Sequence, residues 1–327
     1  MRTRTPLSAR LARSVVAAAI VALVAGCGGT RDTSAEGEGA PGAQQAPAGT
    51  ITLASADWSS ARASANVIKA VLERRLGYRV RVDVVSAEEM WRAVAEGDAD
   101  ASVSAWLPQT HAGYRARYGD SIVDYGPNLE NVRTGLVVPD VSVGRQTDDT
   151  GERTQPYISV DSIPDLSDYA SRFDGRIIGI EPDAGVMRRT REALLEYGLE
   201  DSFRLVAGSE EDMVAALERA IQTQSWVVVT GWTPHWAFGQ WDLRFLDDPE
   251  NVYGSSEAVH TIATTDLRER HPDAAAFLDA FNWTMEDIGR VALWIHRDNG
   301  TDPYGKALRW IDTHPDQVDT WLNSQTQ

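Results

Sequence analysis

The sequence predicts an α/β protein with two α/β lobes and a ligand cleft between them. Three observations support this fold class. Predicted strands and helices alternate along most of the chain, the alternation forms two successive runs at 50–138 and 140–231, and the last third is mostly helical. Such alternation favours parallel sheets with helices on both faces. We therefore expect lobe 1 to comprise 50–138 plus about 240–327, where the tail packs back on it, and lobe 2 to comprise 139–239.

Each element is predicted from its own local pattern. Short alternating or apolar segments predict strands at 50–54, 78–85, 101–105, 135–138, 176–180, 203–206 and 226–230. Helical periodicity predicts helices at 60–76, 88–96, 185–197, 210–223, 266–271, 272–281, 286–296 and 305–321. Gly77, Gly97 and Gly198 stop three of these helices, and Pro315 breaks the last one. The polar stretch 143–156 is typical of a surface insertion, and the C-terminal third has no obvious sheet of its own.

The N-terminus has the pattern of an export signal. A basic stretch at 2–13 precedes a small, apolar stretch at 14–26 that is too short to span a bilayer. The run Val24-Ala25-Gly26-Cys27 then has the form of a lipobox, in which Cys27 accepts the lipid. A plain signal peptide with an unrelated cysteine is the alternative. Residues 28–49 are rich in Gly, Ala, Ser, Gln and Pro and predict a flexible tether.

Charge and motif content exclude several classes of function. The net charge of −17 argues against nucleic acid or an anionic lipid surface as a partner, because both bind basic faces. Zinc-protease, hydrolase-elbow, P-loop and Rossmann motifs are absent from the sequence. Cys27 is the only cysteine, so its lipidation leaves no thiol nucleophile. We expect no enzyme activity, metal or cofactor, and acidic pairs such as Glu210-Glu211 are predicted to be solvated or to cap helices.

Three of the eleven tryptophans lie at cleft positions. Trp58, Trp106 and Trp232 each come just after a predicted strand, where ligands bind in α/β folds. Indole faces attract a cation that cannot donate hydrogen bonds, so three of them can enclose a trimethylammonium group. The alternative is ordinary core packing. That reading is preferred for the remaining tryptophans, Trp91, Trp226, Trp236, Trp241, Trp283, Trp294, Trp310 and Trp321.

A zwitterionic ligand also needs a site for its carboxylate. The strand-to-helix turn that begins at Glu181 places the amides of Gly185 and Val186 at a helix N-terminus, which favours an anion. His111 can donate a further hydrogen bond, although a structural histidine is the alternative. Asp57, beside Trp58, either braces the site or lies near the bound cation.

Long, ordered motifs resemble one known family. The run Gly-Trp-Thr-Pro-His-Trp at 231–236, followed by Asp-Leu-Arg-Phe-Leu-Asp-Asp-Pro at 242–249, looks like the signature of glycine betaine-binding proteins of ABC importers. Ser-Ala-Trp-Leu-Pro at 104–108 with His111, Gly-Leu-Val-Val-Pro at 135–139, and Gly-Ile-Glu-Pro at 179–182 are also similar to that family.

The resemblance implies a type II periplasmic-binding-protein-like fold whose two lobes close on a hinge. It implies a tryptophan prism of Trp58, Trp106 and Trp232 around the quaternary ammonium. It also implies that His111 and the amides of Gly185 and Val186 hold the carboxylate. An ABC permease and its ATPase would be the partners of an exported lipoprotein that faces the periplasm or the cell exterior.

Three alternatives remain open at this point. Choline, carnitine or proline betaine can replace glycine betaine as the main ligand. A carbohydrate-binding lipoprotein also uses tryptophan stacking, although an enzyme of that kind needs two facing carboxylates, and no convincing pair is evident. A sensory or structural surface lipoprotein would lack a transport partner.

Overall fold

The computed structural model describes residues 48–143 and 155–323. Cys27, the predicted signal peptide and nearly all of the predicted tether lie outside these residues. So does most of the predicted insertion, whose flanks are the paired short strands β5 (Ser142–Val143) and β6 (Gln155–Pro156). Among the described residues, no helix combines the length and apolarity needed to cross a membrane.

The main sheet is mixed and has the strand order β2-β1-β3-β11-β4-β9-β7-β8, with β10 also paired to β4. Its two outer parts are parallel, as predicted: β1 pairs with β2 and β3, and β7 pairs with β8 and β9. The strands of the main sheet are β1 (Thr50–Ala56), β2 (Arg79–Val85), β3 (Ala101–Leu107), β4 (Ile122–Pro139), β7 (Arg176–Ile178), β8 (Arg204–Val206), β9 (Val229–Thr233), β10 (Leu243–Phe245) and β11 (Glu257–Thr264).

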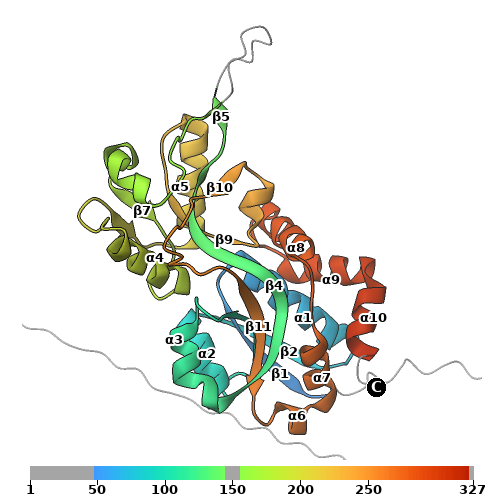
Figure 1. The fold of residues 1–327 in the computed structure, drawn as a ribbon. Coiled ribbons are helices and arrows are strands. Elements are labelled where there is room, and N and C mark those ends of the chain that lie inside the picture. The colour runs from blue at the N-terminus through green and yellow to red at the C-terminus, as the bar shows by residue number, and fades with distance from the viewer. Residues whose placement is uncertain (1–47, 144–154, 324–327) are drawn as a thin grey trace, which may run out of the picture. The chain divides into compact units, whose positions relative to one another are not determined.

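The centre of the sheet corrects the prediction of parallel pairing. β11 runs antiparallel to both β3 and β4, and β4 runs antiparallel to β9. β4 is also much longer than the predicted strand at 135–138 and passes through both parts of the sheet (Figure 1). Its first half pairs with β11, and its second half pairs with β9 and β10. β11, which the sequence did not predict, is therefore a central strand of the main sheet.

Helices cover the sheet, and their ends follow the predicted signals. They are α1 (Ser59–Arg74), α2 (Ala87–Glu96), α3 (Ala112–Tyr118), α4 (Gly185–Glu196), α5 (Glu210–Thr223), α6 (Leu267–Arg270), α7 (Pro272–Ala280), α8 (Met285–Arg297), α9 (Pro303–Thr313) and α10 (Pro315–Asn323). Short 3-10 segments lie at Gly119–Ser121, Pro164–Phe173 and Trp236–Gly239. Gly97 caps α2 at a φ of 82°, a left-handed conformation that glycine adopts without strain. The break at Pro315 separates α9 from α10, as predicted.

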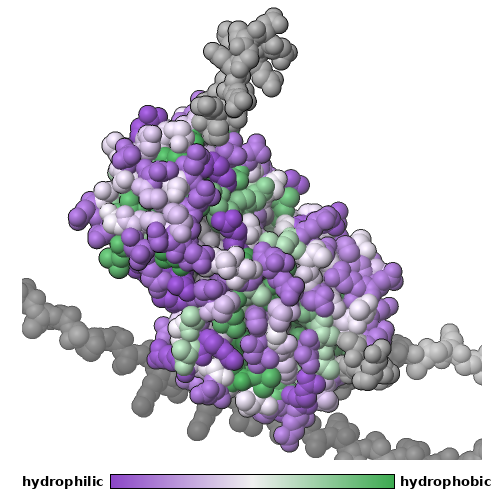
Figure 2. Space-filling model, in the orientation of Figure 1, coloured by the Kyte–Doolittle hydropathy of each residue, from purple (hydrophilic) through white to green (hydrophobic). Residues whose placement is uncertain are grey.

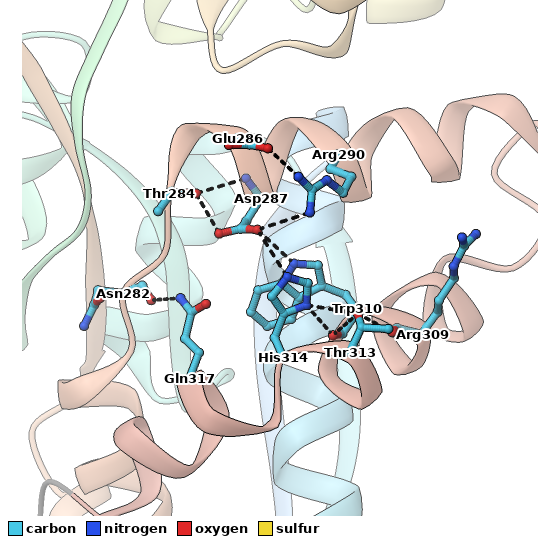
Figure 3. Close-up of polar contacts among 10 residues, drawn as sticks. All are labelled: Asn282, Thr284, Glu286, Asp287, Arg290, Arg309, Trp310, Thr313, His314 and Gln317. Carbon is cyan, nitrogen blue, oxygen red and sulfur yellow. Dashed lines mark hydrogen bonds and ion pairs between the residues drawn. The ribbon is translucent and has the colours of Figure 1, made fainter.

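Helices α8 and α9 pack on α1, and one buried carboxylate joins these two helices. Asp287, at the start of α8, accepts hydrogen bonds from Thr284 Oγ1 at 2.6 Å and from the indole Nε1 of Trp310 in α9 at 3.3 Å (Figure 3). Trp310 in turn stacks on His314 and Trp321, with ring centroids 4.3 and 5.7 Å apart. These tryptophans therefore fill the core, as the sequence predicts. On the face in Figure 2, hydrophilic residues cover most of the described surface.

Candidate functional site

The three tryptophans that follow predicted strands line one cavity. The cavity lies where β3, β9 and the start of α4 come together. Its lining residues are Trp58, Trp106, Thr110, Thr134, Ile180, Ala184, Gly185, Val186 and Trp232. The indole side chains come from three separate segments, yet all three residues are at most 7% exposed. The structure thus brings together five of the six predicted ligand-binding residues around one apolar space.

Strand ends explain why the indoles meet. Trp58 lies between β1 and α1, Trp106 is the penultimate residue of β3, and Trp232 is the penultimate residue of β9. Trp232 pairs across the sheet with Thr134 of β4, which places both residues on the cavity wall. The carboxyl ends of β1, β3 and β9 therefore supply the three rings, in line with the general location of ligands in α/β folds.

His111 is the predicted site residue that does not line the cavity. It is fully buried behind the wall, with its ring 6.0 Å from the ring of Trp58. Its Nδ1 accepts hydrogen bonds from Trp91 Nε1 at 3.1 Å and from the backbone N–H of Trp106 at 3.0 Å. Because Nδ1 is an acceptor twice, the imidazole proton must be on Nε2 in the neutral ring. That Nε2 is buried and has no hydrogen-bond partner among the described residues.

Burial also fixes the charge of His111. Desolvation, with a smaller contribution from the nearby Arg188 guanidinium, lowers the pKa of His111 to about 3. The ring is therefore neutral over the whole physiological range, with its proton on the buried Nε2.

The start of α4 supplies two further donors. Gly185 and Val186 are the first two residues of this helix, so their N–H groups have no intrahelical acceptor. The positive end of the helix dipole adds to their attraction for an anion. Gly185 lies directly against Thr110, since a Cβ at position 185 would come within 2.4 Å of the Thr110 carbonyl oxygen. Only glycine permits this approach of α4 to the loop after β3.

The two sides of the cleft touch around the cavity. Arg189 donates a hydrogen bond to the carbonyl of Gln109 at 3.0 Å, and Tyr114 donates one to the carbonyl of Asp183 at 2.6 Å. The Glu257 carboxylate, 4% exposed, holds the loop after β3 by accepting from the N–H groups of Gln109 and Thr110 at 2.9 and 2.6 Å. The geometry is that of a closed cleft.

Sequence reasoning missed several residues of this site. Thr134, Ile180, Thr110 and Ala184 line the cavity, although the sequence analysis assigned none of them to the site. Thr134 Oγ1 and Trp232 Nε1 are both buried without a hydrogen-bond partner among the described residues.

Two acidic residues named in the sequence analysis lie outside the cavity. Asp57, the acidic residue singled out beside Trp58, forms an exposed ion pair with Arg62 at 2.5 Å and does not line the cavity. Glu210, predicted to be solvated or to cap a helix, does open α5 but is only 5% exposed.

Comparisons with known proteins identify the family and the fold of this chain. A family model for the substrate binding domain of ABC-type glycine betaine transport systems matches residues 49–313. The glycine betaine/carnitine transport binding protein GbuC of Listeria monocytogenes is 42% identical over 157 residues, which are 48% of this chain and 52% of that protein. The chain thus aligns with about half the length of that relative.

Two solved structures share both the fold and substantial identity. Lactococcal OpuAC, in a closed-liganded conformation with glycine betaine, has a TM-score of 0.74 and 37% identity, covering 84% of this chain and 99% of its own. The glycine/betaine/L-proline-binding protein ProX of Borrelia burgdorferi has a TM-score of 0.77 and 30% identity, covering 84% of this chain and 97% of its own. The type II periplasmic-binding architecture, two α/β lobes with a cleft between them, is therefore shared with these proteins.

Proposed function

This chain belongs to the OpuAC family of substrate-binding domains of ABC-type glycine betaine transport systems, and from that premise we propose that it captures glycine betaine for import. The single observation that carries the proposal is the convergence of Trp58, Trp106 and Trp232 on one cavity. The chain acts as a transport subunit and not as an enzyme.

The tryptophan cavity suits a permanent positive charge. A quaternary ammonium has no N–H to donate and therefore forms no hydrogen bonds with water. It loses no such bonds when aromatic faces replace the water around it. Each desolvated indole face contributes about 2 kcal/mol to cation binding. Three faces, with Ile180 and Ala184 completing an apolar wall, favour a trimethylammonium group over a hydrated cation.

The donors beside the cage suit the carboxylate of the same ligand. In this proposal the carboxylate accepts from the N–H groups of Gly185 and Val186 and from His111 Nε2–H. The buried Nε2–H of His111 has no hydrogen-bond partner among the described residues, which supports this assignment. An unpaired buried donor destabilises the protein, and a bound carboxylate would remove that cost. Choline lacks a carboxylate and would leave these donors unused, so we place it second to betaines.

Closure and delivery complete the mechanism. We propose lobe 1 as 50–138 plus about 240–327 and lobe 2 as 139–239, with ligand contacts from both lobes made only in the closed form. A ligand with such contacts shifts the population toward closure. The closed protein then docks on an ABC permease, whose ATPase drives transport.

Anchoring is a further part of the proposal. The basic and apolar leader, the lipobox that ends at Cys27 and the tether at 28–49 support export and lipidation of Cys27. The lipid would hold the protein at the membrane, facing the periplasm or the cell exterior, within reach of the permease.

Calorimetric titration tests the proposed ligand directly. Glycine betaine, carnitine, proline betaine, choline and a set of sugars are titrated into the purified protein. We expect a betaine to bind most tightly, at micromolar affinity or about −8 kcal/mol. Binding of a sugar with no response to any quaternary ammonium compound would overturn the proposal.

A further inference from the structure

One carboxylate contacts the cage from outside. Trp58 Nε1 donates a hydrogen bond to Glu181 Oε2 at 3.3 Å, although the two residues are 123 positions apart. Glu181 lies just before α4 and is partly buried, while Trp58 is 7% exposed. The bond therefore joins a wall of the cage to the turn that carries the anion-binding amides.

Glu181 does not line the cage itself. It lines a second cavity, together with Asp57, Trp58, Asp183 and Ala184 among others. Trp58 and Ala184 line both cavities. The Trp58 indole thus stands between the cage and the carboxylate, so Glu181 acts on a caged ligand through this ring and not by contact.

The Glu181 carboxylate has two electrostatic effects on a caged cation, one through its hydrogen bond with Trp58 and one through its own charge. An indole whose N–H donates to an anion carries more electron density on its face, which strengthens cation–π attraction. The anionic charge itself also acts through a partly desolvated region, where charges are weakly screened. Burial raises the pKa of Glu181, and the hydrogen bond from Trp58 opposes that rise.

We propose that Glu181 is a positioning residue that, through Trp58, makes the cage select a permanent positive charge over an uncharged group of the same shape. This inference deepens the proposed function and rests on it. The alternative is that Glu181 merely holds the rotamer of Trp58. In that case its removal would affect every ligand of the right shape equally.

A pair of isosteric ligands separates these two roles. In 3,3-dimethylbutanoate a carbon atom replaces the quaternary nitrogen of glycine betaine, while the carboxylate and the three methyl groups are kept. Both ligands are titrated calorimetrically into the wild-type protein and the variants Glu181→Gln and Glu181→Asp. Asp183→Asn is the matched control, because Asp183 lines the same outer cavity and its side chain makes no hydrogen bond with Trp58 in the described structure.

The expected result is a change in selectivity. Glu181→Gln weakens glycine betaine about tenfold and leaves the affinity for 3,3-dimethylbutanoate unchanged or improved. Glu181→Asp keeps the charge and retains most of the preference for the cation. It is a second variant that tests the role of the charge if Glu181→Gln does not fold. Asp183→Asn changes the ratio of the two affinities by less than about threefold.

Two results would overturn the inference, and a third would overturn the proposed function on which it rests. Equal losses for both ligands in Glu181→Gln would assign a purely structural role. Unchanged affinity for glycine betaine would show that the carboxylate has no effect on the cage. If the wild-type protein binds neither ligand, the proposed function itself fails and the inference falls with it.

Discussion

Glu210 Oε2 accepts a hydrogen bond from the backbone N–H of Ser59 at 2.8 Å, across 151 positions of the chain. Ser59 follows Trp58 directly, and the other oxygen of Glu210 lies 3.0 Å from His235 Nε2. The His235 ring packs edge-on against Trp232, with centroids 4.7 Å apart. One buried carboxylate therefore links the segments that carry two walls of the cage.

We expect Glu210→Gln to loosen that link. In the glutamine side chain an NH2 group replaces the oxygen that faces His235 Nε2. The neutral amide oxygen is also a weaker acceptor for the backbone N–H of Ser59. Loss of a charge-assisted buried bond costs about 1.5–3 kcal/mol, so affinity for glycine betaine should fall about tenfold or more. Glu211→Gln is the control, since Glu211 is 69% exposed and lies 3.9 Å from Arg62. If both variants bind glycine betaine as tightly as the wild type, the contacts of Glu210 do not support the cage.

The same carboxylate predicts a dependence of stability on pH. Burial raises the pKa of Glu210, but His235 and the Ser59 donors outweigh it and hold the pKa below the ordinary value of a glutamate. A carboxylate whose pKa is lower in the folded than in the unfolded state stabilises the fold at pH values above the unfolded pKa. This contribution is lost as the pH falls through the folded pKa. The difference in melting temperature between wild type and Glu210→Gln should therefore shrink below about pH 4.5. A constant difference down to about pH 3 would count against it.

The cage predicts large effects from two tryptophans. Trp106→Ala and Trp232→Ala should each weaken binding of glycine betaine about tenfold or more, because each removes one aromatic face. Trp294→Ala is the control, since Trp294 lies in α8 under the Arg309 guanidinium and does not line the cavity. Intrinsic fluorescence and calorimetry measure the affinities. Unchanged affinity in both cage variants would remove the aromatic cage from the mechanism.

His111 predicts a ligand-specific loss and a flat pH profile. His111→Ala removes the Nε2–H donor, so glycine betaine should lose more affinity than choline, which has no carboxylate. With a pKa of about 3, wild-type His111 stays neutral where a free imidazole protonates, near 6.5. Affinity should therefore stay constant from about pH 8 to about pH 5. A drop in affinity centred near 6.5, or equal losses for the two ligands, would contradict the assigned role.

Sequence patterns predicted the parts of this protein that depend on local chemistry. Strand-end tryptophans, a helix N-terminus that begins with Gly185 and the stops at Gly97 and Pro315 all have local signatures. β11 escaped prediction because Glu257 and His260 interrupt its apolar residues and because 261–264 are buried on both faces, so no regular alternation marks the whole strand. Its Val, Thr and Ile content was the available signal.

Residues that act through long-range contacts had no local signature at all. Glu210 opens a helix as an ordinary first-turn acid, and only the fold brings Ser59 and His235 to its carboxylate. Glu181 lies in a recognised turn, yet its contact with Trp58 depends on two lobes meeting. Such pairs become visible only once the cleft is closed.

Gly185 gives the sharpest test of that closed arrangement. In Gly185→Ala the added methyl group would lie 2.3 Å from Thr110 Cγ2 and 2.4 Å from the Thr110 carbonyl oxygen. Neither contact is tolerated, so α4 must move away from the loop after β3 and the cleft must open. We expect affinity for glycine betaine to fall about tenfold or more, because a small displacement misaligns the donors. The melting temperature of the ligand-free protein should change little if opening relieves the clash.

Gly289→Ala provides the matched control for this substitution. Gly289 lies in α8, and a Cβ there would meet nothing within 4 Å. That variant should bind like the wild type and be equally or more stable, since alanine favours a helix over glycine by about 1 kcal/mol. Small-angle scattering with saturating ligand then measures closure, which Gly289→Ala should reach and Gly185→Ala should not. Full compaction of Gly185→Ala on ligand addition would show that the approach of α4 to Thr110 is not required for binding.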